Sequence, residues 1–116
     1  MPWEFTNDRP VYAQLVDEIM LRIISGVYPS GTRIDSVRDL AEQAQVNPNT
    51  MQKALQEVER LGLIYSQRTS GKYVTEDEEL IKGTRLSIAK SEIEAFISKM
   101  NKLGMSTEEI VKLFDT

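Results

Sequence analysis

A stripe of amide and cationic side chains runs through residues 47–60, "NPNTMQKALQEVER". On a helical wheel, the apolar side chains of this stretch gather on one side and leave a polar side opposite. The polar side carries Asn49, Gln52, Lys53, Gln56 and Arg60. An amide can donate and accept together, as bidentate reading of adenine requires, and a lysine can approach guanine or a phosphate. We therefore expect this side of the helix to face DNA.

Two neighbouring stretches carry further donors. Ser36, spaced as an N-cap before Asp39, starts a helix whose first turn contains Arg38. A turn between two β-rich runs carries Arg68, Ser70, Gly71 and Lys72. Basic residues around a small residue and a glycine suit entry into a narrow minor groove. The first-turn amides of the stripe helix are expected to add a site for a phosphate oxygen.

The composition removes several kinds of chemistry. The chain has no Cys and no His, so it has no disulfide, no thiolate nucleophile, no imidazole base and no usual zinc ligand. Acidic residues cluster only at helix starts and in the run "TEDEE". We expect no enzyme activity, no metal site and no cofactor.

Net charge and hydropathy limit the kinds of partner that the chain can bind. The net charge of −4 is unevenly spread, with eight basic against nine acidic residues in 1–75 and six against nine in 76–116. A phosphate backbone responds to the charge of one face, not to the total. No apolar run approaches the roughly 20 residues that span a bilayer, and no signal pattern opens the chain. We expect a cytoplasmic protein without a membrane partner.

The order of predicted elements is that of a winged helix. Apolar residues at steps of four follow Pro10 and predict a first helix, and a short extended piece "TRI" precedes the second. A tight turn leads to the stripe helix, capped by Asn47 and begun by Pro48, and "LIYSQ" and "KYVT" predict a hairpin. The fold class is mainly α with a small β-wing. On the stripe helix, the residues expected to be buried are Met51, Ala54, Leu55, Val58 and Leu61.

A second pattern begins after the wing. Apolar residues alternate at spacings of three and four over residues 80–103, which is typical of a coiled-coil seam. The seam consists of Leu86, Ala89, Ile93, Phe96, Met100 and Leu103. Ser106 and Glu109 are spaced as a capping box for a short last helix. We expect residues 1–75 to form a winged-helix domain with an N-terminal arm, and residues 76–116 a helical tail that forms a homodimer.

Residues 9–74 resemble the GntR family of bacterial transcriptional regulators, specifically its short YtrA-like branch, which carries a two-helix tail in place of a ligand-binding domain. The resemblance implies a dimeric repressor of a small operon, often one that contains an ABC transporter. By position, Arg38 resembles the second-helix arginine that contacts DNA. The start of the recognition helix is matched by residues 47–50, including Asn47 and Thr50, and the wing by residues 68–72.

Three positions depart from the family pattern: Asp35 replaces a usual Pro, Gln52 a usual Arg and Thr69 a common wing Gly. Together they make the operator sequence unpredictable from that of relatives. An activator would look the same as a repressor in sequence. A winged helix that binds another protein without reading DNA remains an alternative, as does an effector pocket between subunits, and the effector is unknown.

Overall fold

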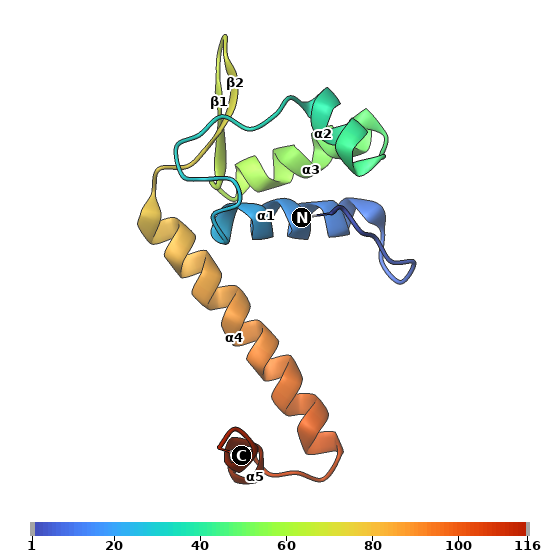
Figure 1. Cartoon of the computed structure of the whole chain (residues 1–116), viewed down its shortest axis with the longest axis vertical. Helices are drawn as coiled ribbons and strands as arrows, with labels where there is room; N and C mark the ends of the chain where they lie inside the picture. Colours follow the sequence, from blue (N-terminus) through green and yellow to red (C-terminus); the bar gives the residue numbers. More distant parts are fainter. Residues whose placement is uncertain (1, 116) are drawn as a thin grey trace. The chain divides into compact units, whose positions relative to one another are not determined.

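The computed structural model describes residues 2–115, which form five helices and a two-stranded antiparallel sheet in the order α1-α2-α3-β1-β2-α4-α5. Contacts divide the chain into two compact units, one ending at Lys82 and the other beginning at Gly83. Figure 1 shows the first unit with α1 (Val11–Ile24), α2 (Val37–Ala44), α3 (Pro48–Arg60) and the hairpin. The predicted winged helix with C-terminal helices is confirmed.

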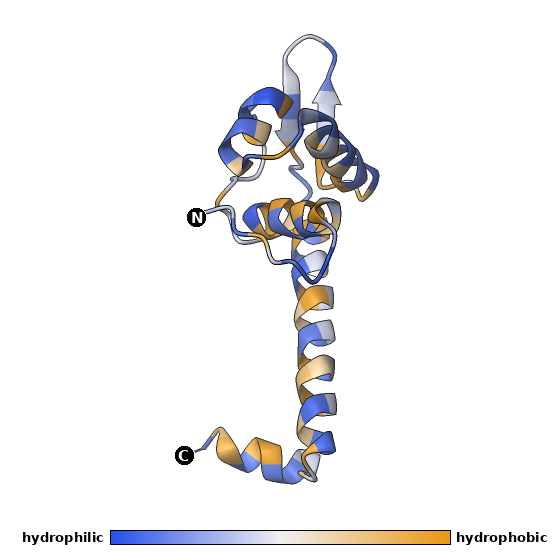
Figure 2. Ribbon diagram, turned by 90° about the vertical axis from the view of Figure 1, so that its right-hand side faces the viewer, coloured by the Kyte–Doolittle hydropathy of each residue, from blue (hydrophilic) through white to orange (hydrophobic). Residues whose placement is uncertain are grey.

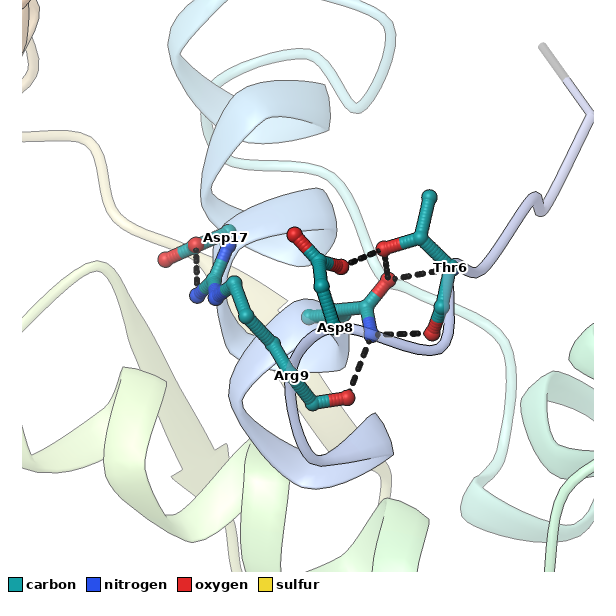
Figure 3. Close-up of polar contacts among 5 residues, drawn as sticks. Thr6, Asp8, Arg9 and Asp17 are labelled. Atoms are coloured by element: carbon teal, nitrogen blue, oxygen red, sulfur yellow. Dashed lines mark hydrogen bonds and ion pairs between the residues drawn. The ribbon is translucent and has the colours of Figure 1, made fainter.

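The N-terminal arm is fastened to α1 by the side-chain amide of Gln14. Its Nε2 donates to the carbonyl oxygens of Thr6 and Arg9, at 2.9 and 2.7 Å, and its Oε1 accepts from the Thr6 amide at 2.8 Å. Arg9 also forms an ion pair of 2.7 Å with Asp17 (Figure 3). The arm therefore follows the first turns of α1.

The hydrophobic core of the first unit joins α1, α2, α3 and the hairpin. In α1, Leu15, Ile19 and Ile23 recur at steps of four and are almost fully buried. In α3, the buried residues are Met51, Ala54, Leu55 and Val58. They belong to one cluster, against which the arm residues Trp3 and Phe5 also pack. Burying a Leu or Ile side chain stabilises a fold by about 1.5–3 kcal/mol, so this cluster orients α3.

The turn between α2 and α3 is as tight as expected. Gln45 ends α2 in the left-handed conformation at φ 56°, and the Val46 amide donates to the Ala41 carbonyl at 3.0 Å. This return bond closes the helix end and redirects the chain at once. The Asn47 side chain then accepts from the Asn49 amide at 2.8 Å and starts α3. The left-handed residue at position 45 provides this abrupt change of direction.

The wing consists of β1 (Ile64–Gln67) and β2 (Gly71–Val74). Their antiparallel register pairs Ile64 with Val74 and Gln67 with Gly71. Gly71 has φ 104°, in the region that glycine adopts without strain, and it begins β2 directly after the turn. The expected extended piece before α2 lies along the other edge of β2, where Arg33 forms an isolated bridge with Tyr73.

One prediction for the core is wrong. Leu61 was expected to be buried on the apolar side of α3, but it is 37% exposed. Helix α3 ends at Arg60, and Gly62 at φ 85° turns the chain away before the next side chain on the wheel reaches the core. Leu63 occupies the core instead and is 1% exposed.

The long helix α4 spans Glu78–Lys102, and α5 spans Thr107–Leu113. The first turns of α4 belong to the first unit, where Ile81 is 5% exposed. In the second unit, Figure 2 shows apolar and polar bands alternating along α4. Gly104, at φ 89°, ends the helix region, and Ser106 and Glu109 form the predicted capping box of α5. None of the helices within residues 2–115 combines the length and apolarity needed to cross a bilayer.

Replacing Leu55 by Ala tests the core assignment. Leu55 is fully buried, so the substitution removes transfer free energy and leaves a cavity. We expect it to lower the free energy of unfolding by about 2–5 kcal/mol, measured by urea denaturation. Leu61→Ala, at the position that follows the end of α3, is the comparison and should lower this free energy by clearly less, about 1 kcal/mol, because Leu61 is 37% exposed. Equal losses in the two variants would contradict the placement of Leu61 outside the core.

Candidate nucleic-acid interface

Helix α3 presents the predicted polar stripe on the side opposite to the core. Asn49, Lys53 and Gln56 are exposed and Gln52 is half-buried. Both views in Figures 1 and 2 place α2, α3 and the hairpin on the same side of α1. The donors of the stripe are therefore presented by a helix whose orientation the core determines.

The first turn of α3 does not offer the free amides that the sequence predicted. Pro48 has no N–H, and the Asn49 amide donates to the Oδ1 of Asn47. The amides of Thr50 and Met51 both donate to the Asn47 carbonyl, at 3.0 and 3.1 Å. The prediction of a phosphate site on these amides is wrong because the cap satisfies them. Asn47 retains its side-chain NH₂ as a donor, and Thr50 its hydroxyl.

At the start of α2, Ser36 caps the helix and Arg38 remains available to bind an anion. The Ser36 Oγ accepts from the Asp39 amide at 3.1 Å, as the spacing predicted. Arg38 is exposed and forms no ion pair within residues 2–115. The carboxylate of Asp35 accepts from the Gln43 side chain at 2.8 Å, so it is drawn toward the helix. Arg38 is thus the available cation of α2.

At the hairpin, the turn residues differ in how firmly they are held. Ser70 Oγ accepts from the Tyr73 hydroxyl at 3.1 Å, which ties the turn to β2. Arg68 lies within the turn, is exposed and has no ion-pair partner in the described part of the chain. Tyr73 also stacks on Tyr65 across the hairpin, with ring centroids 5.8 Å apart. The wing therefore presents Arg68 from an ordered hairpin.

Lys72 is engaged inside the protein. Its Nζ donates to Glu59 of α3 at 2.8 Å and to the Ser66 hydroxyl at 3.0 Å, and Ser66 also donates to Glu59. The hydrogen bond from Lys72 is the main reason that the pKa of the Glu59 carboxyl lies below its ordinary value. The pair therefore stabilises the fold above the ordinary Glu range, and this contribution is lost as pH falls through the lowered pKa. It connects the wing to the end of α3.

Ion pairs divide the cations of this region into two groups. Lys72 and Arg60 are neutralised, the latter by Glu57 at 2.6 Å. Arg38, Lys53 and Arg68 are exposed and have no ion-pair partner among the described residues. Exposed cations without a carboxylate can neutralise phosphates at little cost. The available positive charge is thus distributed over α2, α3 and the wing.

The sequence pattern did not single out Arg33, whose side chain lies against Gly71 at the start of β2. Arg33 is exposed and also has no ion-pair partner within residues 2–115. No local motif marks it, because its position near the wing results from pairing with a strand about 40 residues further along the chain.

The α3 stripe borders an open depression shared with the start of α1. Its lining consists of Tyr12, Thr50, Lys53, Gln56, Glu57 and Arg60. Ligand sites for small molecules are usually enclosed and mostly apolar. An open surface of this kind is better suited to a macromolecule. No group of three or more acidic residues within residues 2–115 is arranged to hold a metal ion.

Comparison with known proteins identifies the family. A family model described as "Bacterial regulatory proteins, gntR family" matches residues 11–74, more than half of the chain. The chain belongs to the GntR family. It is thus a DNA-binding transcriptional regulator and not an enzyme, as the sequence predicted. This supports DNA binding over the alternative of a winged helix that binds only another protein.

Relatives extend the match beyond the winged helix. The HTH-type transcriptional repressor YtrA of Bacillus subtilis (strain 168) is 30% identical over 106 residues, which cover 90% of this chain and 81% of that protein. The GntR family transcriptional regulator of Listeria monocytogenes has a structure with TM-score 0.89 and 41% identity, covering 96% of this chain and 97% of that one. The predicted short YtrA-like branch is confirmed over nearly the full length.

A second structure contains DNA. The DNA-binding domain of AraR in complex with operator ORX1 has TM-score 0.58 and 28% identity, covering 65% of this chain and 99% of that one. The similarity corresponds to a winged-helix module that is about two thirds of the present chain. This fold therefore binds operator DNA in that protein.

Glu59→Gln tests whether the internal ion pair limits DNA binding. The substitution leaves Lys72 without its carboxylate, so its ammonium group becomes free to neutralise a phosphate. We expect tighter binding to a DNA duplex and a slope of log K against log salt that is steeper by up to about 0.9, measured by fluorescence anisotropy.

Glu108→Gln, which removes the same charge from the exposed surface of α5, is the control for this experiment. It should leave the salt slope unchanged. If Glu59→Gln leaves the slope unchanged as well, Lys72 does not reach the duplex in either state.

Proposed function

We propose that this protein is a homodimeric repressor that binds an inverted-repeat operator. The observation that carries the proposal is the presence, in one short chain, of a winged helix with unpaired cations and an exposed apolar seam on α4. The winged helix provides one recognition surface per subunit. The seam provides a means of pairing two subunits.

In this proposal α3 enters a major groove. Gln52 and Lys53 approach base edges, as amide and ammonium groups do in direct readout. Arg38 and Arg68 flank them from α2 and the wing and neutralise phosphates. Asn49 and Gln56 extend the polar stripe toward either end of the contact.

The capped and engaged residues have supporting roles in the same contact. Ser36 and Asn47 cap the starts of α2 and α3. Each side chain retains a donor for the DNA backbone. Ser70 and Gly71 shape the wing turn. Lys72 can bind a phosphate only if its ion pair with Glu59 breaks.

The seam supports a second copy as the partner of the tail. Four of its large side chains are 43–71% exposed, namely Leu86, Ile93, Phe96 and Leu103. Ala89 is exposed too, and Met100 is half-buried. Exposed large apolar side chains at these spacings support an interaction site on the second unit. Spacings of three and four match a helix of the same sequence, which a two-fold axis brings opposite.

Aromatic residues of α4 and α5 extend this surface. The Phe96 and Phe114 rings lie 6.4 Å apart, and Phe114 itself is largely exposed. Ile110 is buried and anchors α5, while Val111 and Leu113 stay exposed. The short helix thereby adds apolar area to the proposed dimer contact.

Repression follows from occupation of a promoter. The relative YtrA is named a repressor, and the AraR domain was solved with an operator. A two-fold dimer with one α3 per half requires half-sites about one helical turn, roughly 34 Å, apart. In keeping with the short YtrA-like branch, we propose an operon containing a transporter as the target.

Binding to the upstream promoter fragment tests operator recognition. We expect protection of an inverted repeat in footprinting, with half-site centres about one helical turn apart, because each subunit reads one half. Affinity should fall steeply with salt, and a scrambled fragment of the same composition should bind more weakly. Equal binding to both fragments would contradict specific operator recognition.

Ile93→Asp tests the dimer. A carboxylate in the middle of an apolar interface loses its hydration without a partner, so we expect a monomer in sedimentation equilibrium and at least tenfold weaker operator binding. Lys102→Asp places the same group on the last turn of α4 outside the seam and should remain dimeric. A dimeric Ile93→Asp variant with wild-type operator affinity would refute the seam.

A further inference from the structure

The segment before α2 lies along the free edge of β2 and meets it in one isolated bridge. The Ile34 amide donates to the Lys72 carbonyl at 3.0 Å, and the Val74 amide donates to the Thr32 carbonyl at 2.9 Å. These bonds flank Arg33, which therefore lies opposite Tyr73 in an antiparallel bridge. Ile34 is buried in the core. The backbone of Arg33 is thus held on both sides by β2.

The bridge with Tyr73 determines the direction of the Arg33 side chain, which lies along the wing. Side chains alternate between the faces of a sheet, so Arg33 shares a face with Tyr73 and with the position of Gly71. A Cβ built on Gly71 would lie 3.1 Å from the Arg33 Nε and 3.3 Å from its Nη2. The guanidinium therefore crosses the bare backbone of Gly71. A side chain at position 71 would have to displace it.

No carboxylate neutralises this guanidinium within residues 2–115. Asp35, two residues along the chain, accepts a hydrogen bond from Gln43. Glu59 is bound to Lys72 and Ser66. Lys72 and Ser66 occupy the opposite face of the hairpin from Arg33, because they lie one position away from Tyr73 and Tyr65 in the paired strands.

We propose that Arg33 is a further DNA-binding residue, which binds a backbone phosphate beside the groove that the wing enters. The proposal rests on DNA binding by the winged helix but does not require an operator or a dimer. The guanidinium lies beside β2, not within the 68–70 turn, so it meets the duplex backbone next to the turn. Its planar fork binds a phosphate through two parallel hydrogen bonds.

This contact gives the wing two cations from different parts of the chain. Arg68 is carried by the turn itself, whereas Arg33 is supplied across Gly71 by a segment that precedes α2. Lys72, which the sequence places at the same turn, is held by Glu59. Arg33 compensates for that engaged lysine. Gly71 has two reasons to be a glycine, its φ of 104° and the guanidinium above it.

The experiment compares Arg33→Gln and Arg33→Lys with the wild-type full chain on a random-sequence duplex and on the promoter fragment. Lys102→Gln removes one cation from the second unit and is the matched control. For Arg33→Gln we expect roughly tenfold weaker binding to both duplexes and a salt slope shallower by about 0.9. Arg33→Lys should retain the slope, because it retains the charge, while losing severalfold in affinity with the bidentate geometry.

Several outcomes would overturn the proposal. Arg33→Gln binding that equals that of Lys102→Gln would exclude a contact. A loss confined to the promoter fragment would indicate a base contact in place of a phosphate. A loss of affinity in Arg33→Lys equal to that in Arg33→Gln, with a lowered melting temperature in both, would indicate a purely structural role. The random-sequence duplex separates this result from operator recognition, because promoter preference can fail while the Arg33 effect on the slope persists.

Discussion

Burial of one side of α3 against α1 is the constraint on which the rest of the structure depends. Once Met51, Leu55 and Val58 enter the core, the helical period leaves no freedom in where Gln52, Lys53 and Gln56 point. The caps and the left-handed Gln45 then act on a helix whose rotation is already determined. A regulator that reads bases needs this rigidity, because an error of a few ångströms at the helix surface moves every donor away from its base edge.

The distribution of carboxylates explains how an acidic chain can bind a polyanion. Net charge is −4, yet the carboxylates near α3 are paired with particular cations, Glu57 with Arg60 and Glu59 with Lys72. These pairs are local and partly exposed, so they contribute little to stability individually. Their larger effect is on which positive groups remain available. The available guanidinium and ammonium groups come from α2, α3, the wing and the segment before α2 that bridges to β2.

Much of the fold could be predicted because its signals are local. The apolar steps of α1, the caps at Ser36, Asn47 and Ser106 and the glycine of the wing turn each act within a few residues, and each is found where the pattern indicated. The failures occur where a neighbouring element decides. Leu61 fits the helical wheel but follows the end of the helix, and the first-turn amides of α3 are taken by the cap that starts it. The roles of individual DNA-binding residues stay predictions, and so does a domain boundary between residues 75 and 76.

The sequence by itself determined the order of elements, the polar side of α3, the seam on α4 and the membership of a regulator family. Periodicity and capping carry the information on the elements, because they depend on residues within one or two turns, whereas the family was indicated by the resemblance of residues 9–74. Only the tertiary structure decided which cations are available. Lys72 meets Glu59 of another element, and Arg33 reaches Gly71 through a strand pairing between distant segments. Such contacts depend on register and on the direction in which each side chain leaves its strand, and neither is recorded in the spacing of residue types along the chain.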